Sequence, residues 1–109
     1  MTKYLIIWSI NPNAWPTDPS AAAQGMEMLY AGIDEGVKSG RILEFGFFLS
    51  GNAGYAIDSS DGKDQIMTSF LNYPWIERDV QEIVDYETGK EISRQVKKTQ
   101  AEQMAAMKR

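Results

Sequence analysis

The sequence predicts an α+β fold, in which helices cover a four-stranded antiparallel sheet and a further helix follows at the C-terminal end. Three observations support this fold class. Strand-like and helix-like segments alternate in the order β-α-β-β-α-β-α, and a glycine-rich turn joins the two consecutive strands. The length of 109 residues fits one domain, and 43% hydrophobic residues suffice for a core.

The first strand is predicted at residues 3–10, KYLIIWSI. Strands that are apolar on both faces are typical of the centre of a covered sheet, and we expect this strand to lie there. One face carries the even-numbered residues and the other carries Leu5 and Ile7. The even-numbered residues are Tyr4, Ile6, Trp8 and Ile10.

A long first helix is predicted after the proline-rich segment 11–19. Asp18 suits the N-cap and Pro19 the first helical position, and Gly40 suits the left-handed position after a last turn that ends near Lys38. Gly25, Gly32 and Gly36 lie beside the apolar stripe, so we expect a close approach to the sheet. The stripe comprises Met26, Leu29, Tyr30, Ile33 and Val37.

The second and third strands are predicted at residues 41–50 and 54–58, joined by the turn SGNAG. Glu44 and Phe48 would lie on the face opposite the core. The core face would carry Leu43, Phe45, Phe47 and Leu49.

A second helix is predicted from Ser59 and Ser60 to Asn72, where Pro74 ends it. Its buried side would carry Ile66, Phe70 and Tyr73. A fourth strand at 79–87, a turn at 87–90 and a last helix at 91–108 complete the chain. We expect residues 1–89 to form the domain and residues 90–109 to pack on it or on a partner subunit.

This order of elements is the split βαβ, or ferredoxin-like, arrangement. Right-handed crossovers place both crossover helices on one face of the sheet. The other face would still carry large apolar side chains, from Tyr4 or Leu5 through Trp8 and Phe48. Because exposed apolar area of that size marks an interaction surface, we expect a second copy to cover it in a homodimer.

Five segments carry a resemblance to known proteins: KYLIIWSI, VKSG, ILEFGFFLS, SGNAGYAI and YPW. In order and length, residues 1–87 resemble the ferredoxin-like dimeric α/β-barrel superfamily. It includes muconolactone isomerases, YCII-related proteins, stress-responsive barrel proteins and cofactor-independent antibiotic-biosynthesis monooxygenases. The resemblance implies a homodimeric α/β barrel. It assigns no catalytic residue, because YCII-related and stress-responsive members typically rely on a histidine and this chain has none.

Composition excludes several classes of function. The chain has no His and no Cys, which removes most nucleophile–base pairs, most transition-metal sites and any disulfide scaffold. A net charge of −4 argues against a nucleic-acid partner, and no phosphate-binding glycine motif occurs. The short N-terminal apolar run predicts neither a signal peptide nor a membrane span, so we expect a cytoplasmic protein. We also expect no cofactor.

Charge is unevenly distributed along the chain. Residues 90–109 hold six Lys or Arg against two Glu, and the remainder of the chain is acidic. We expect this helix to dock through charge complementarity, or to be an ordinary solvated helix.

Two groups of residues are candidates for catalysis. Glu44, mid-strand on the face that a dimer would enclose, could act as a general acid or base if desolvated; alternatively it reaches solvent, or pairs with Arg41 or with a Lys across the interface. Asn11, close in sequence to Trp8 and Trp15, could orient a flat organic ligand, although Asn11 and Asn13 also suit Asx turns. Tyr55 is the other residue that a cofactor-independent enzyme could use. A metal site at Asp58, Asp61 and Asp64 is disfavoured, since this spacing better suits a turn and a helix N-terminus.

Aromatic side chains are the candidates for ligand binding, with core packing as the alternative for each. They are Trp8, Trp15, Phe48, Tyr73 and Trp75. Three functions remain open: a protein that binds a small apolar or aromatic molecule, a cofactor-independent isomerase or monooxygenase-like enzyme, and a structural or regulatory dimer with a filled core. A cavity of at least about 300 Å³ with a few convergent polar groups would favour the first two.

Overall fold

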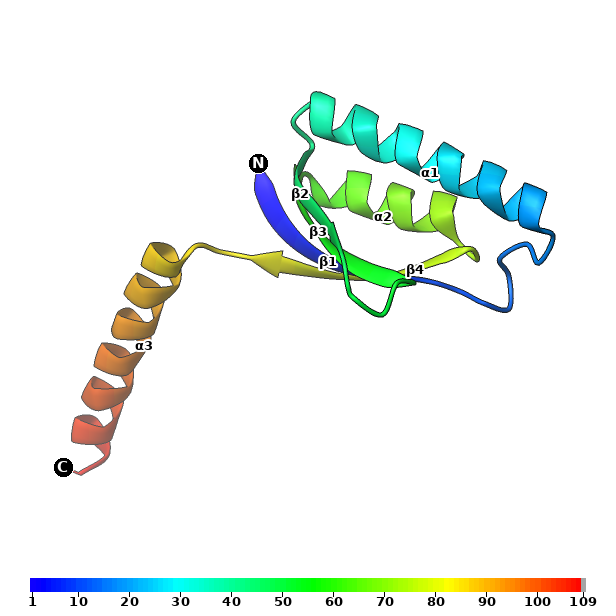
Figure 1. Cartoon of the computed structure of the whole chain (residues 1–109). Helices are drawn as coiled ribbons and strands as arrows, with labels where there is room; N and C mark the ends of the chain where they lie inside the picture. The colour runs from blue at the N-terminus through cyan, green and yellow to red at the C-terminus, as the bar shows by residue number, and fades with distance from the viewer. Residues whose placement is uncertain (109) are drawn as a thin grey trace.

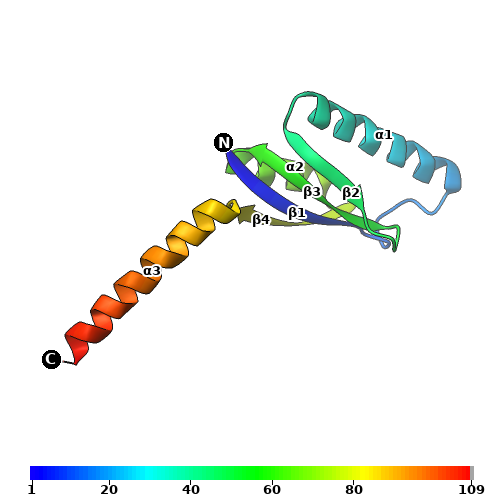
Figure 2. The same cartoon turned by 60° about the vertical axis from the view of Figure 1, so that its left-hand side comes forward.

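The computed structural model describes residues 1–108 and has the predicted α+β order (Figure 1). A four-stranded antiparallel sheet has the strand order β2-β3-β1-β4, which is the ferredoxin-like arrangement. Helices α1 and α2 lie on the same face of this sheet (Figures 1 and 2). The elements are β1 (Thr2–Ile10), α1 (Pro19–Lys38), β2 (Ile42–Phe47), β3 (Ala53–Ser60), α2 (Gly62–Asn72), β4 (Ile76–Ile83) and α3 (Tyr86–Met107).

Strand β1 lies in the centre of the sheet, as predicted, because it pairs with β3 on one side and β4 on the other. Ile6 is opposite Ala56 in β3 and Val80 in β4. The buried core forms on the face that the helices cover, around Ile6, Trp8, Ala56 and Ile76. Trp8 therefore faces the helices, which corrects the expectation that it lies on the bare face: it has the same parity along β1 as the buried Ile6.

The predicted core face of β2 is wrong at both ends. A register shift between Ile42 and Glu44 interrupts the alternation, so that Ile42 is buried with the core while Leu43 is 52% exposed. The strand ends at Phe47, and Leu49 lies beyond it in the turn, fully exposed. The register shift accounts for the exposure of Leu43, and the end of the strand accounts for that of Leu49; single-strand periodicity reveals neither.

The caps of α1 are as predicted. The Asp18 carboxylate accepts a hydrogen bond from the backbone N–H of Ala21 at 2.9 Å, with Pro19 in the first turn. The helix ends at Lys38, and Gly40 follows with φ at 82°, in the left-handed region. Of the predicted stripe, Tyr30 and Val37 are exposed, whereas Gly36 is buried at the contact with β2.

The inner face of α2 is polar, and the prediction for this helix is wrong. Ile66 and Phe70 are 59% and 77% exposed, whereas Gln65 is 4% exposed. Strand β3 continues through Ser60, so the N-cap is Asp61, whose carboxylate accepts from the N–H of Asp64 at 3.0 Å. The sheet beneath α2 presents polar side chains, and the helix turns its matching polar residues toward them.

The last strand and helix begin earlier than predicted. Strand β4 covers Ile76–Ile83, and α3 begins at Tyr86, so the segment predicted as a turn at 87–90 is helical. Asp85 explains the early start, because its carboxylate accepts from the N–H of Thr88 at 2.8 Å as an N-cap.

Helix α3 stands away from the rest of the chain (Figures 1 and 2). It has no buried residue, and it extends the longest dimension of the chain to 72 Å. Over residues 1–108, no helix is long and apolar enough to span a membrane.

The face of the sheet without helices carries the odd-numbered residues of β1 and β3. Leu5 lies opposite Ile57, and Ile7 lies opposite Tyr55. Phe48, just beyond β2, stacks on Tyr55 with ring centroids 6.4 Å apart. We refer to the surface formed by Leu5, Ile7, Phe48, Tyr55 and Ile57 as the bare face.

Candidate binding cavity between the sheet and the helices

A cavity of about 250 Å³ lies between the sheet and the two crossover helices. Strands β1, β2, β3 and β4 form its floor, and α1 and α2 supply its walls. Most of its lining is apolar, with a smaller polar group at Arg41, Asp58 and Arg78. Its apolar lining includes Ile6, Trp8, Ile10, Leu29, Ile33, Ile42, Phe45, Ala56 and Ile76.

Aromatic rings form one wall of the cavity. Trp8 stacks on Phe45, with ring centroids 5.3 Å apart and planes at 16°, and meets Phe47 edge-on at 5.4 Å. Gly54 makes room for the indole, since a Cβ atom there would lie 2.5 Å from Trp8 Cζ2. The Trp8 Nε1 donor is buried without a hydrogen-bond partner in the described chain. The alternation in β1 and a glycine in β3 thus place a flat aromatic surface at the cavity.

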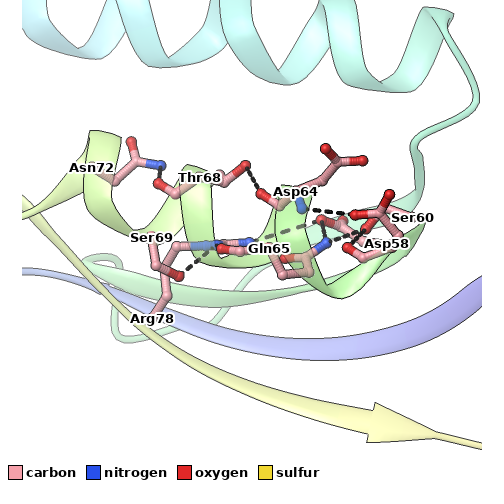
Figure 3. A network of polar contacts seen from close by, with 9 residues as sticks. Asp58, Ser60, Asp64, Gln65, Thr68, Ser69, Asn72 and Arg78 are labelled. Atoms are coloured by element: carbon pink, nitrogen blue, oxygen red, sulfur yellow. Dashed lines mark hydrogen bonds and ion pairs between the residues drawn. The ribbon is translucent and has the colours of Figure 1, made fainter.

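Arg78 of β4 links the sheet to α2 through hydrogen bonds (Figure 3). Its Nη1 donates to the backbone oxygen of Gln65 at 3.1 Å and to Ser69 Oγ at 2.8 Å, and its Nη2 donates to Gln65 Oε1 at 2.7 Å. The same guanidinium lies 3.8 Å from the Asp58 carboxylate, and both side chains are almost fully buried. Because a planar guanidinium has five donors, one residue can hold two turns of the helix.

Asp58 is only partly satisfied. Gln65 Nε2 donates to Asp58 Oδ2 at 2.9 Å and to Ser60 Oγ at 2.8 Å. Asp58 Oδ1 has no partner, although the residue is 3% exposed. An unsatisfied buried acceptor costs about 1–3 kcal/mol. Asp58 therefore has one buried carboxylate oxygen for which the described chain provides no donor.

The charges near the cavity act on Arg78. Burial lowers the pKa of Arg78, Asp58 opposes that shift, and the positive charge of Arg41 adds to the lowering. The two guanidinium groups, which both line the cavity, thus repel each other.

The candidate residues Glu44, Tyr55 and Phe48 come together on the opposite side of the sheet. A side-chain hydrogen bond to Glu44 raises the pKa of Tyr55, and burial and the charge of Glu44 raise it further. Gly46 makes room for the Tyr55 ring, since a Cβ there would lie 2.8 Å from Tyr55 Cζ. None of these three side chains lines the cavity.

The remaining candidates lie at the loops around the sheet. Asn11 Nδ2 donates to the backbone oxygen of Pro74 at 3.1 Å, and Asn11 Oδ1 accepts from the N–H of Asn13 at 3.1 Å. Trp15 packs on Gly25 of α1 and against the core. Tyr73 and Trp75 are exposed. Of all the predicted site residues, only Trp8 lines the cavity.

Sequence analysis missed Gln65 and Arg78 and considered Asp58 only for metal binding. A signal was present in the alternation: Asp58 follows Gly54 and Ala56 on one face of β3, and Arg78 lies between Ile76 and Val80 on one face of β4. A charged residue at a core position of each strand indicates a buried pair once the two strands are known to face the same helix.

Comparison with known proteins gives no further guide. No protein-family model matches the chain, and no curated protein matches it. The functional argument therefore rests on the cavity and its lining.

Proposed function

We propose that this protein binds a small molecule with an apolar body in the cavity between the sheet and the helices. The observation that carries the proposal is the mostly apolar cavity of about 250 Å³, whose lining includes the stacked rings of Trp8 and Phe45 together with three charged residues, Arg41, Asp58 and Arg78. Small-molecule sites are mostly apolar with a few polar groups that orient the ligand. The volume lies below the about 300 Å³ expected of a typical small-molecule site. An apolar cavity of about 150 Å³ already holds benzene, however, so this one has room for a substituted ring.

Binding is favoured over the enzymatic alternative by where the side chains lie. Glu44 and Tyr55, two of the candidate catalytic residues, are on the bare side of the sheet, whereas the cavity is on the helix side. A molecule in the cavity would not reach them.

We also propose that two copies pair through the bare face to form a homodimeric α/β barrel. The bare face exposes Ile7 and Phe48, and α3 exposes an apolar stripe at Ile92, Val96 and Met104. A single helix without tertiary contacts is marginal in water, because most helical stability in proteins comes from packing. A second subunit would give both surfaces a place to pack.

Native mass spectrometry of the purified protein tests both proposals in one experiment. We expect a dimer mass and a small molecule that is retained under gentle desolvation and lost on unfolding. A monomer at high protein concentration would contradict the dimer.

A matched pair of variants locates the binding site. Gly32 lines the cavity, and a Cβ atom there meets nothing within 4 Å, so we expect Gly32→Leu to bring an apolar side chain into the cavity. Ala31→Leu adds the same side chain on an exposed position of α1 that does not line the cavity. With benzyl alcohol as a neutral probe in ligand-observed NMR, we expect binding to the wild type and Ala31→Leu but not to Gly32→Leu. Equal binding to all three, or to none, would contradict the proposed function.

A further inference from the structure

We infer that the cavity takes a small aromatic monocarboxylate whose carboxylate group pairs with Arg41. The inference rests on the proposed binding function and specifies its ligand. Three ionised side chains line the cavity: Arg41, Asp58 and Arg78. Their sum is one positive charge, in a chain whose net charge is −4.

The opposite charges of Asp58 and Arg78 compensate each other. Arg78 Nη2 lies 3.8 Å from Asp58 Oδ2. Gln65 bridges the two side chains, because its Nε2 donates a hydrogen bond to Asp58 Oδ2 and its Oε1 accepts one from Arg78 Nη2. Arg78 also donates to Ser69, so its donors are largely used within the fold. This pair holds α2 on the sheet, and the positive charge that remains belongs to Arg41.

Arg41 has no acidic partner in the described chain. Among residues 1–108 the ion pairs are Arg78–Asp58 and Lys90–Glu87, and the guanidinium of Arg41 makes no hydrogen bond there. The side chain is nevertheless half-buried and reaches the cavity. A cation that has lost part of its hydration gains most from a carboxylate, which a guanidinium can bind through two parallel hydrogen bonds.

The guanidinium of Arg41 lies against α1 at Gly36. A Cβ atom on Gly36 of α1 would lie 2.8 Å from Arg41 Nη2, so the guanidinium rests close to the helix backbone at this glycine. Arg41 also acts electrostatically on Arg78, as noted above. An anion beside Arg41 would reduce the repulsion between the two guanidinium groups.

The rest of the cavity sets the body of the ligand. The stacked rings of Trp8 and Phe45 form a flat apolar wall, and the volume of about 250 Å³ suits one substituted ring. The ligand class is therefore an anion with an aromatic body, such as benzoate.

The test compares benzoate with benzamide, its neutral isostere, on the full chain by ligand-observed NMR titration. Charge-assisted hydrogen bonds predict that benzoate binds about tenfold more tightly than benzamide, or better. Arg41→Gln should bring benzoate to the level of benzamide and leave benzamide unchanged. Arg94→Gln removes the same charge from exposed α3 and should change neither affinity. Arg41→Lys keeps the charge without the two-pronged geometry and should retain part of the preference, which provides a second measurement should Arg41→Gln fold poorly.

The outcomes separate this inference from the proposed function. Equal affinity for benzoate and benzamide, with both lost in Gly32→Leu, would keep the binding function and overturn the carboxylate assignment. A benzoate preference that survives in both Arg41 variants would overturn it as well. Absence of binding by either probe at about 10 mM, the weak end of specific binding, would refute both proposals.

Discussion

Two glycines one turn apart in α1 should respond in opposite ways to the same substitution. Glycine in a helix costs about 1 kcal/mol relative to alanine, so Gly32→Ala and Gly36→Ala gain similar helix propensity. At Gly32 the new Cβ meets nothing within 4 Å, and we expect the free energy of unfolding to rise by about 0.5–1 kcal/mol. At Gly36 the new Cβ would lie 2.7 Å from Ile42 Cγ1 and 2.8 Å from Arg41 Nη2.

Overpacking of a close contact costs about 1–3 kcal/mol, which exceeds the gain in propensity. Gly36→Ala should therefore lower the free energy of unfolding by about 1–2 kcal/mol, because the helix must move away from β2. Urea unfolding followed by circular dichroism measures the stability of both variants. If the dependence of the free energy of unfolding on urea concentration is unchanged, the change in stability does not come from the denatured state. A stability of Gly36→Ala equal to or above that of Gly32→Ala would refute the close approach of α1 to the sheet. Since Arg41 rests on Gly36, the same variant should also weaken benzoate binding.

Three further changes test the polar contacts. Arg78→Met leaves a buried carboxylate without its cation and should cost about 3–5 kcal/mol in urea unfolding; a loss below about 1 kcal/mol would show that the pair is not buried as described. The backbone N–H of Thr88 lowers the pKa of Asp85, so capping of α3 is present above the ordinary value of 3.8 and is lost as pH falls through the lowered pKa. Far-ultraviolet circular dichroism should show this loss in the wild type but not in Asp85→Asn, which caps without titrating, and a loss of equal size in both would contradict it. Glu44→Gln should bring the pKa of Tyr55 down toward its ordinary value of 10.0, measured by NMR titration of its ring; an unchanged pKa would mean that the two side chains are not in contact.

Prediction from the sequence succeeded where the signal was local. Asp18, Pro19 and Gly40 mark the ends of α1, because caps depend on a few neighbouring residues. The apolar residues on both faces of β1 indicated a central strand, and its pairing with β3 and β4 confirms it.

Prediction failed where two distant segments decide the outcome. Ile66 and Phe70 follow helical spacing, yet they face solvent because Arg78 and Asp58, from two different strands, require polar partners beneath α2. The cavity residues were missed for the same reason, since Asp58 and Arg78 are 20 positions apart and meet only through strand pairing with β1.

The amino-acid sequence by itself determines the order of elements, the central strand and the caps of the first helix, since each of these follows from a pattern among residues that are close in sequence. Only the tertiary structure decides which face of α2 is buried, that β2 shifts its register after Ile42, and that Arg41 lies beside a mostly apolar cavity with no acidic partner among residues 1–108. These three features depend on which side chains from distant strands lie on the same surface. A charged side chain can be buried only where another part of the chain supplies an ion-pair or hydrogen-bond partner.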